Sequence, residues 1–329
     1  MADIALTENI AIASRNRAVR RFGMQDVRFR GFTALAALSV VVIFCGVIVS
    51  LVLGAMPSIK QFGFSFLQTD AWNPVTENYG ALASIYGTLI TSALAMLVAL
   101  PVGIGIAIFL TEICPRSLRR PIGIAIELLA GIPSIIYGIW GLFVFAPEFQ
   151  QTAEPWLIAI LGNIPGLQSF FAGPPYGIGV FTASLILSIM ILPFISAVTR
   201  DVFETVPSIL KEAAYGLGCT TWEVVWRVVL PFARTGVVGG AMLALGRALG
   251  ETMAVTFVIG NAHHIQGSVF APGTTISATI ANEFSEATTT MYQSAVIELG
   301  LILFFITFVV LASAQLMLRV LERRTGGAS

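Results

Sequence analysis

The sequence predicts an all-α integral membrane protein with six transmembrane helices. Of its 329 residues, 56% are hydrophobic and 11% are charged, a balance far from that of soluble domains. The apolar residues also gather in nearly uncharged runs of about 20 residues or more, the length that crosses the hydrocarbon core of a bilayer. These runs occupy residues 32–55, 84–110, 122–146, 177–199, 236–259 and 293–317.

The basic residues predict the orientation of these helices, because short loops rich in Lys and Arg stay on the cytoplasmic side. Of the 18 basic residues, only Lys60 falls in an outside loop and only Arg247 lies within a span. We therefore expect a multi-pass protein of the cell inner (plasma) membrane with both termini cytoplasmic. Its expected parts are a cytoplasmic N-terminal segment 1–31, a first transmembrane helix 32–55, a periplasmic loop 56–83, a five-helix core 84–317 with a cytoplasmic loop 200–235, and a cytoplasmic tail 318–329.

The N-terminal segment is basic but holds no apolar stretch. We therefore expect no cleavable signal peptide in residues 1–30. Its arginines suit contacts with the headgroups of membrane lipid, and we expect no nucleic acid as a partner.

The third span contains a predicted kink at residues 131–138, which read GIPSIIYG. Pro133 removes a helix hydrogen bond near mid-span, and the glycines loosen packing there. The hydroxyls of Ser134 and Tyr137 would then lie at a depth where they could line an anion path. A packing kink without a ligand is the alternative.

The fifth span carries two charges, although a charge at the bilayer centre costs about 2.5–3.5 kcal/mol even on the lenient insertion scale. Arg247 and Glu251 are four residues apart, one helical turn, and are expected near mid-membrane on the substrate path. Gly236, Gly240 and Ala244 share their predicted face, so this stripe should point into the bundle. A buried ion pair that only joins helices is the alternative.

The loop 200–235 carries the signals of two short helices joined by a turn. Pro207 suits the first turn of a helix, and Gly218 suits the left-handed residue that ends it. Thr220 and Glu223 have the spacing of a capping box that opens a second helix, which Pro231 is expected to close or kink. An ordinary interhelical loop with a good cap is the alternative to a docking element.

The loops expected outside, 56–83, 147–176 and 260–292, are long enough that we expect a partner to dock there. Residues 146–177 combine Trp156 with an apolar patch and several prolines. This composition favours an interfacial helix that lies on the membrane.

No metal site, disulfide or cofactor is expected. His263 and His264 are adjacent on an Asn/Gly loop without other His and without nearby Cys, so a loop role is favoured over metal binding. Cys45 lies in a span, whereas Cys114 and Cys219 are expected to face the cytoplasm, where disulfides are rare.

The loop 200–235 also matches a long signature. Its residues, in order, are Glu212, Ala213, Ala214, Gly218, Val228, Leu230 and Pro231. Their spacing resembles the EAA signature E-A-A-x3-G-x9-I-x-L-P of ABC importer permeases, with Val228 in place of the usual Ile. The resemblance implies that these residues couple the chain to a cytoplasmic ATPase.

Two further segments resemble a narrower family. Residues 246–261 read GRALGETMAVTFVIGN, and residues 128–138 read LLAGIPSIIYG. Both resemble PstC-type permeases of phosphate ABC importers, which have the ABC importer type I (MetI-like) permease fold. The resemblance covers most of residues 82–320, whereas residues 1–81 match mainly in topology.

The resemblance implies a permease subunit of an ATP-driven importer of inorganic phosphate. It implies a heterodimer with a PstA-type permease, a dimer of a PstB-type ATPase on the cytoplasmic side, and a PstS-type phosphate-binding protein outside. On the substrate path it implies Arg247 as counter-charge for the phosphate ion, near Glu251, Ser134, Tyr137 and Thr252.

The chain itself carries no ATPase motif, since no lysine stands in a G-x4-G-K-[ST] loop. An enzyme is not expected, because no nucleophile with its base is visible. One alternative function is a permease for another oxyanion, sulfate or molybdate. A more distant one is a stand-alone channel or secondary transporter, for which inverted repeats would be expected.

Overall fold

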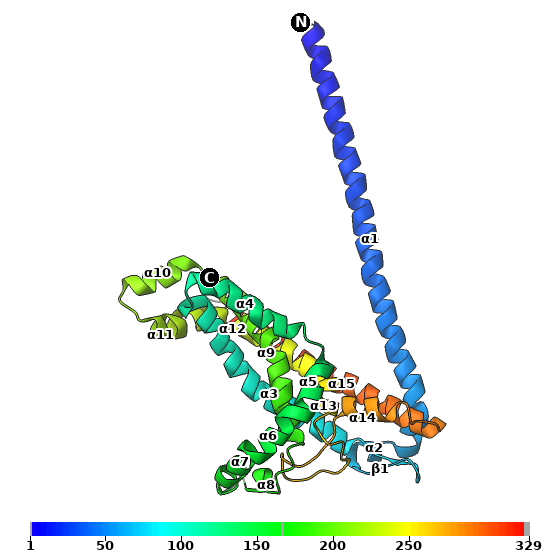
Figure 1. The fold of residues 1–329 in the computed structure, drawn as a ribbon. Helices are drawn as coiled ribbons and strands as arrows, with labels where there is room; N and C mark the ends of the chain where they lie inside the picture. The colour runs from blue at the N-terminus through cyan, green and yellow to red at the C-terminus, as the bar shows by residue number, and fades with distance from the viewer. Residues whose placement is uncertain (1, 166–167, 326–329) are drawn as a thin grey trace. The chain divides into compact units, whose positions relative to one another are not determined.

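The computed structural model describes residues 2–165 and 168–325, with side chains described for 28–165 and 168–320. The chain divides into a first unit that ends at Leu53 and a second unit that begins at Gly54. The first unit is the greater part of one long helix, α1, which runs from Ala2 to Phe62. The second unit holds the helical bundle, with the loop 200–235 and the segments 128–138 and 246–261 (Figure 1).

The second unit is built mainly from long helices joined by short ones. Its long elements are α3 (Leu82–Ile108), α4 (Arg116–Ala130), α9 (Val180–Glu204), α12 (Leu230–Leu249) and α15 (Thr290–Thr325). Its short helices are α2 (Ser65–Gln68), α5 (Ser134–Trp140), α6 (Ala146–Gln151), α7 (Ala153–Leu161), α8 (Gln168–Phe171), α10 (Ser208–Gly216), α11 (Thr221–Val224), α13 (Met253–Thr256) and α14 (Ile276–Glu283). Three π-helical turns follow α3, α5 and α11, at Phe109–Ile113, Gly141–Phe145 and Val225–Val229.

The one described sheet is a small hairpin. Strand β1 (Trp72–Asn73) pairs antiparallel with β2 (Asn78–Tyr79), and Trp72 lies opposite Tyr79. Figure 1 shows this hairpin, α14 and α6–α8 at one end of the second unit and α10 and α11 at the other. We call these the hairpin end and the elbow end.

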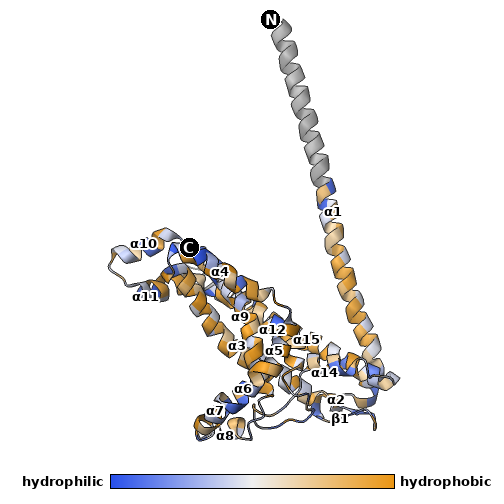
Figure 2. Cartoon of the chain, viewed as in Figure 1, coloured by the Kyte–Doolittle hydropathy of each residue, from blue (hydrophilic) through white to orange (hydrophobic). Residues whose placement is uncertain are grey.

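The prediction of six transmembrane helices is confirmed when one bent pair of helices counts as a single span. Five helices in the described part of the chain are long and apolar enough to cross a membrane: Arg28–Phe62, Leu82–Ile113, Val180–Glu204, Thr221–Leu249 and Thr290–Val320. The sixth is the pair Arg116–Ala130 and Ser134–Gln151, which is bent by 85°. Figure 2 shows hydrophobic residues along most of α3 and along most of the coloured part of α1.

The third and fifth spans differ from their predicted forms. The expected kink at Pro133 is a complete break, because α4 ends at Ala130 and α5 begins at Ser134. The fifth helix is displaced toward the N-terminus: it runs as one span over Thr221–Leu249 instead of 236–259.

Pro231 does not end the helix that Thr220 opens, so the predicted closure at this proline is wrong. It lies in the first turn of α12, directly after the π-helical turn Val225–Val229. A π turn shifts the hydrogen-bond register by one residue, and proline is tolerated at the first helical positions. The helix therefore continues through the proline.

The core lies around α9, the most buried of the spanning helices. Gly103 of α3 allows α9 to approach closely, because a Cβ there would lie 2.6 Å from Ile195 Cγ2. Gly240 of α12 has the same role, with Val198 Cγ1 of α9 at 2.7 Å from the position of a Cβ. Small residues of this kind are what lets membrane helices pack backbone to backbone.

Candidate functional site

The break between α4 and α5 is stabilised by a tyrosine. Pro133 stands just before α5 in extended conformation, and proline disfavours helix at the residue before it. The Tyr137 hydroxyl donates a hydrogen bond of 2.8 Å to the carbonyl oxygen of Leu129. That carbonyl is in the last turn of α4, where it also accepts a longer hydrogen bond of 3.3 Å from the Ile132 N–H. Tyr137 thereby ties α5 to α4 across the 85° bend.

A second break separates α12 from α13. α12 ends at Leu249 with Gly250 as its C-cap, and α13 begins at Met253. Arg247 lies in the last turn of α12, and Glu251 lies in the break, where its Oε1 accepts a hydrogen bond of 3.3 Å from the backbone N–H of Ala254. Glycine is a poor helix former and a good C-cap, so the helix stops where the prediction extended it.

The expectation that Arg247 and Glu251 are one turn apart on one helix is therefore wrong. No ion pair joins their side chains within the described residues. Arg247 is exposed in the single chain, whereas Glu251 is half-buried. Of the stripe predicted to share their face, Gly236 and Gly240 pack against α9.

The two breaks meet in space. A Cβ at Gly138 of α5 would lie 2.8 Å from Phe257 Cδ2 and 3.0 Å from the carbonyl oxygen of Met253. The absence of a side chain there lets α5 lie directly on α13. Thr252, whose hydroxyl donates to Gly250 O at 3.3 Å, belongs to the same break. The structure thus joins two segments that the sequence analysis selected separately.

Ser134 and Tyr137 differ in what their hydroxyls can offer an anion. Ser134 is half-buried at the start of α5 and makes no side-chain hydrogen bond among the described contacts. Tyr137 as a residue is 8% exposed, and its hydroxyl already donates a hydrogen bond to the carbonyl oxygen of Leu129. It cannot donate to an ion while it holds that bond.

The elbow end carries the predicted helix-turn-helix, which we call the elbow and define as residues 207–224. Gly218 has φ +86°, and its N–H donates to Tyr215 O at 2.9 Å, while Cys219 N–H donates to Ala214 O at 3.2 Å. These two bonds form the Schellman motif that ends α10. Thr220 and Glu223 form the predicted capping box at the start of α11. Both cap predictions are confirmed.

The elbow presents most of its signature residues to solvent. Glu212, Ala213 and Gly218 are exposed, whereas Ala214 is buried against the bundle. Nothing lies within 4 Å of the position of a Cβ at Gly218. Leu230 and Pro231 lie at the start of α12, half-buried and exposed respectively.

One contact that the sequence analysis missed anchors the elbow to the bundle. Lys211 Nζ of α10 lies 2.6 Å from Glu112 Oε1, and their side chains are 19% and 6% exposed. Glu112 belongs to the π-helical turn after α3, so the pair links the second span to the residue before Glu212. The sequence holds two lysines, Lys60 and Lys211, and this rarity was the signal that could have drawn attention to Lys211.

A family model described as binding-protein-dependent transport system inner membrane component matches residues 99–327. The chain belongs to that family. Two curated relatives named phosphate transport system permease protein PstC are similar over nearly their whole length. The protein from Mesorhizobium japonicum is 64% identical over 95% of this chain and 96% of its own. The protein from Pasteurella multocida is 58% identical over 92% of this chain and 94% of its own.

Among solved structures, a bacterial alginate ABC transporter in complex with an alginate pentasaccharide-bound periplasmic protein is similar to this permease. The similarity covers 92% of this chain and 97% of that chain, with a TM-score of 0.60 and 19% sequence identity. At this identity the similarity concerns the fold, and it confirms the predicted ABC importer permease fold.

The permease has a second long-range ion pair near the elbow end. Arg200 of α9 lies 2.7 Å from Glu127 Oε1 of α4 and 3.0 Å from Asp201. Glu127 is 49% exposed, and exposed pairs stabilise by only about 0–1 kcal/mol. The Lys211–Glu112 pair is the more buried of the two.

No metal site is formed by the side chains that the structure describes: no three His, Cys, Asp or Glu residues come together. His263 stacks on Trp72, and His264 contacts Asp70. Both histidines lie in the loop 260–275 and contact neighbouring segments at the hairpin end.

Proposed function

We propose that this permease is the transmembrane subunit of an ATP-driven importer of inorganic phosphate. The support is its 64% identity, over 95% of its length, to a protein named as a phosphate transport permease. Its membrane-spanning helices and its family agree with a transport role, in which ATP hydrolysis belongs to a partner ATPase.

The observation that carries the proposed path is the position of Arg247. Its side chain is exposed in the single chain although it lies in a spanning helix, beside the two helix breaks. A guanidinium at membrane depth requires an aqueous path, an anion or another protein chain around it. We infer that a second, PstA-type permease covers this face and that phosphate passes between the two chains.

Within this path each residue has a separate role. Arg247 attracts the phosphate anion as a bidentate donor. Ser134 and Thr252 lie at the two breaks: the Ser134 hydroxyl is available to the ion, and the Thr252 hydroxyl reaches the ion when it releases its long bond to Gly250 O. Glu251 caps α13 and limits the positive charge, so that the anion leaves again. Tyr137 fixes the bend between α4 and α5, since its hydroxyl donates to Leu129.

The elbow is the proposed contact with a PstB-type ATPase dimer. An ordinary loop would not need a Schellman turn, a capping box and a buried ion pair to hold nine helical residues rigid. In our proposal the elbow end and both termini are cytoplasmic, and the hairpin end receives phosphate from a PstS-type binding protein. ATP binding closes the ATPase dimer, the elbow moves as a lever, and the spans open outward.

The test of this function is ATP-dependent uptake of labelled phosphate by cells that express the chain with its three proposed partners. We expect unlabelled phosphate to compete, and a hundredfold excess of sulfate or molybdate not to compete. Equal competition by sulfate would favour the alternative of another oxyanion permease. Uptake that persists without the ATPase would favour a stand-alone transporter.

The role of Arg247 is tested by Arg247→Gln, with Arg234→Gln as control. Arg234 is exposed in the first half of the same helix and makes no ion pair among the described residues. We expect Arg247→Gln to abolish uptake while the complex still assembles, and Arg234→Gln to retain uptake. Loss of assembly in Arg247→Gln would indicate that the arginine joins helices instead.

A further inference from the structure

The two histidines of the protein each face a carboxylate from a different segment at the hairpin end. His264 Nδ1 lies 3.0 Å from Asp70 Oδ2, just before the hairpin. His263 Nε2 lies 3.8 Å from Glu283 Oε1, at the end of α14. One dipeptide of the loop 260–275 therefore contacts two other segments through titratable groups.

The His263 contact is the more buried of the two. The side chains of His263 and Glu283 are 21% and 16% exposed. The His263 ring stacks on Trp72, with centroids 5.5 Å apart and planes 13° apart. On the other side, the Tyr292 hydroxyl donates a hydrogen bond to Glu283 Oε2. The carboxyl of Glu283 is thus enclosed by an imidazole and a phenol, with little access to water.

Burial determines where a proton enters this cluster. It raises the pKa of Glu283 above its usual value; the nearby Trp72 indole opposes this increase, and the Glu286 carboxylate adds to it. Burial also lowers the pKa of His263, which favours its neutral form in the closed loop. A proton that enters on Glu283 removes the negative charge of a desolvated group, and the two neighbouring groups titrate as a coupled pair.

The other titratable groups around the cluster do not provide this response. Asp70 and Glu77, beside and within the hairpin, are in contact with solvent. Tyrosine hydroxyls titrate near pH 10, and burial raises the pKa of Tyr79 further. Tyr292 and Tyr86, on α15 and α3, are the remaining groups. His264 is exposed beside Asp70, so Glu283 is the buried carboxyl of this cluster.

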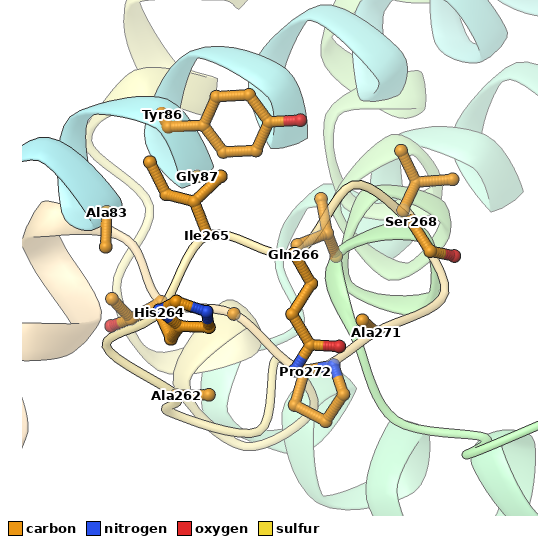
Figure 3. Close-up of a pocket in the computed structure, with 14 residues that line it drawn as sticks. Ala83, Tyr86, Gly87, Ala262, His264, Ile265, Gln266, Ser268, Ala271 and Pro272 are labelled. Carbon is orange, nitrogen blue, oxygen red and sulfur yellow. The ribbon is translucent and has the colours of Figure 1, made fainter. Parts of the chain in front are cut away.

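The loop 260–275 is bonded to the segment after α13 and to the start of α9. Its Gly273 N–H donates to the carbonyl oxygen of Ile259, three residues after the end of α13, at 2.9 Å. Phe181 N–H, in the first turn of α9, donates to Val269 O at 2.8 Å. His264 and Gln266 also line a small cavity under Tyr86 of α3 (Figure 3). Opening of this loop would uncover the hairpin end of the path beside α13.

We propose that Glu283 and His263 form a proton-sensitive latch that holds the loop 260–275 against the hairpin and α14. Closure of the loop buries the Glu283 carboxyl, so the closed state binds a proton on Glu283 more tightly than the open state does. A fall in pH therefore favours the closed state. The sign follows from linkage: with the pKa of Glu283 raised in the closed state, its contribution is present at low pH and is lost as the pH rises through that pKa. Each unit of pKa difference between closed and open states changes the opening equilibrium about tenfold.

The test is hydrogen exchange of backbone amides in residues 261–271, measured between pH 5 and pH 8 on the full chain with its partner subunits in lipid nanodiscs. Rates are divided by the intrinsic exchange rate at each pH. In the unmodified protein we expect protection of this loop to increase severalfold toward pH 5. Glu283→Gln keeps the size and the acceptor for Tyr292 but cannot titrate, and we expect its protection to be independent of pH.

Two variants separate this latch from other causes. Glu286→Gln removes an exposed acid three residues away, and it should keep the pH dependence but move it to lower pH, because the Glu286 charge raises the pKa of Glu283. His263→Phe preserves an aromatic ring on Trp72 and removes the imidazole, whose own titration opposes closure in acid, so this variant should also keep the pH dependence. Protection that does not change with pH in the unmodified protein, or that changes equally in Glu283→Gln, would overturn the proposal. This readout does not involve the transported ion, so it is independent of whether the importer carries phosphate.

Discussion

The contact between the two helix breaks can be tested at Gly138. A Cβ at this position would lie 2.8 Å from Phe257 Cδ2, 3.0 Å from Met253 O and 3.2 Å from Ala254 Cα. Two of these three atoms belong to the backbone of α13, so they cannot rotate away. In Gly138→Ala, α5 must therefore move away from α13.

The size of the effect follows from two opposing terms. Overpacking of a well-packed contact costs about 1–3 kcal/mol, whereas alanine is preferred over glycine in a helix by roughly 0.5–1 kcal/mol. The packed arrangement is thus destabilised by about 1 kcal/mol at the midpoints of these ranges, a factor of roughly 5 in its population. Because the path residues Ser134 and Thr252 flank this contact, phosphate uptake should fall with it.

The assay compares Gly138→Ala with Gly105→Ala, which changes a glycine of α3 that has nothing within 4 Å of the position of its Cβ. Thermal unfolding of the purified complex and uptake by cells are measured for both. We expect Gly105→Ala to match the unmodified protein or to be slightly more stable, and Gly138→Ala to be less stable and less active. If both variants gave the same unfolding temperature and the same uptake, the proposed packing of α5 on α13 would be refuted.

Three further predictions concern the elbow and the hairpin end. Lys211→Met leaves Glu112 buried without its partner and should destabilise the protein by about 3 kcal/mol or more. Adding Glu112→Gln to this variant should recover most of the lost stability. Additive effects of the two substitutions on thermal unfolding would contradict this coupling. Gly218→Ala places a side chain at φ +86°, which should cost about 1–2 kcal/mol and lower the phosphate uptake per ATP hydrolysed. Gly216→Ala, in open space within α10, should change neither. Equal uptake per ATP in the two variants would exclude a role for a rigid turn. Burial raises the pKa of Glu154, so its contribution to stability is present in acid and declines as the pH rises above 4.5; Glu154→Gln should lose this part of the pH dependence of thermal unfolding, and an unchanged profile would argue against it.

The elbow was predictable from sequence because its determinants are local. A left-handed glycine, a capping box and a helix-breaking residue act within one or two turns of the chain. Gly218, Thr220 and Glu223 therefore have the roles that their spacing predicted. Pro231 does not, because the π-helical turn before it removes the need for its missing hydrogen bond.

The helix breaks were only half predictable. Glycine and proline mark residues 131–133 and 250 as weak points, but local signals do not distinguish a kink in one helix from a break between two. At Gly250 the helix ends because Glu251 caps a new helix, which has a buried place against α5. The prediction that Arg247 and Glu251 lie one turn apart required a continuous helix, but α12 ends at Leu249.

By itself, the sequence determined the membrane class, the number of spans, the elbow and the family resemblance, because hydrophobic length, charge placement and capping depend on neighbouring residues. Tertiary structure alone decided which separated residues meet. Lys211 and Glu112 are 99 positions apart, and His264 and Asp70 are 194 apart. Pairing over such separations depends on how whole helices pack, which is a property of their combined surfaces and not of any local pattern.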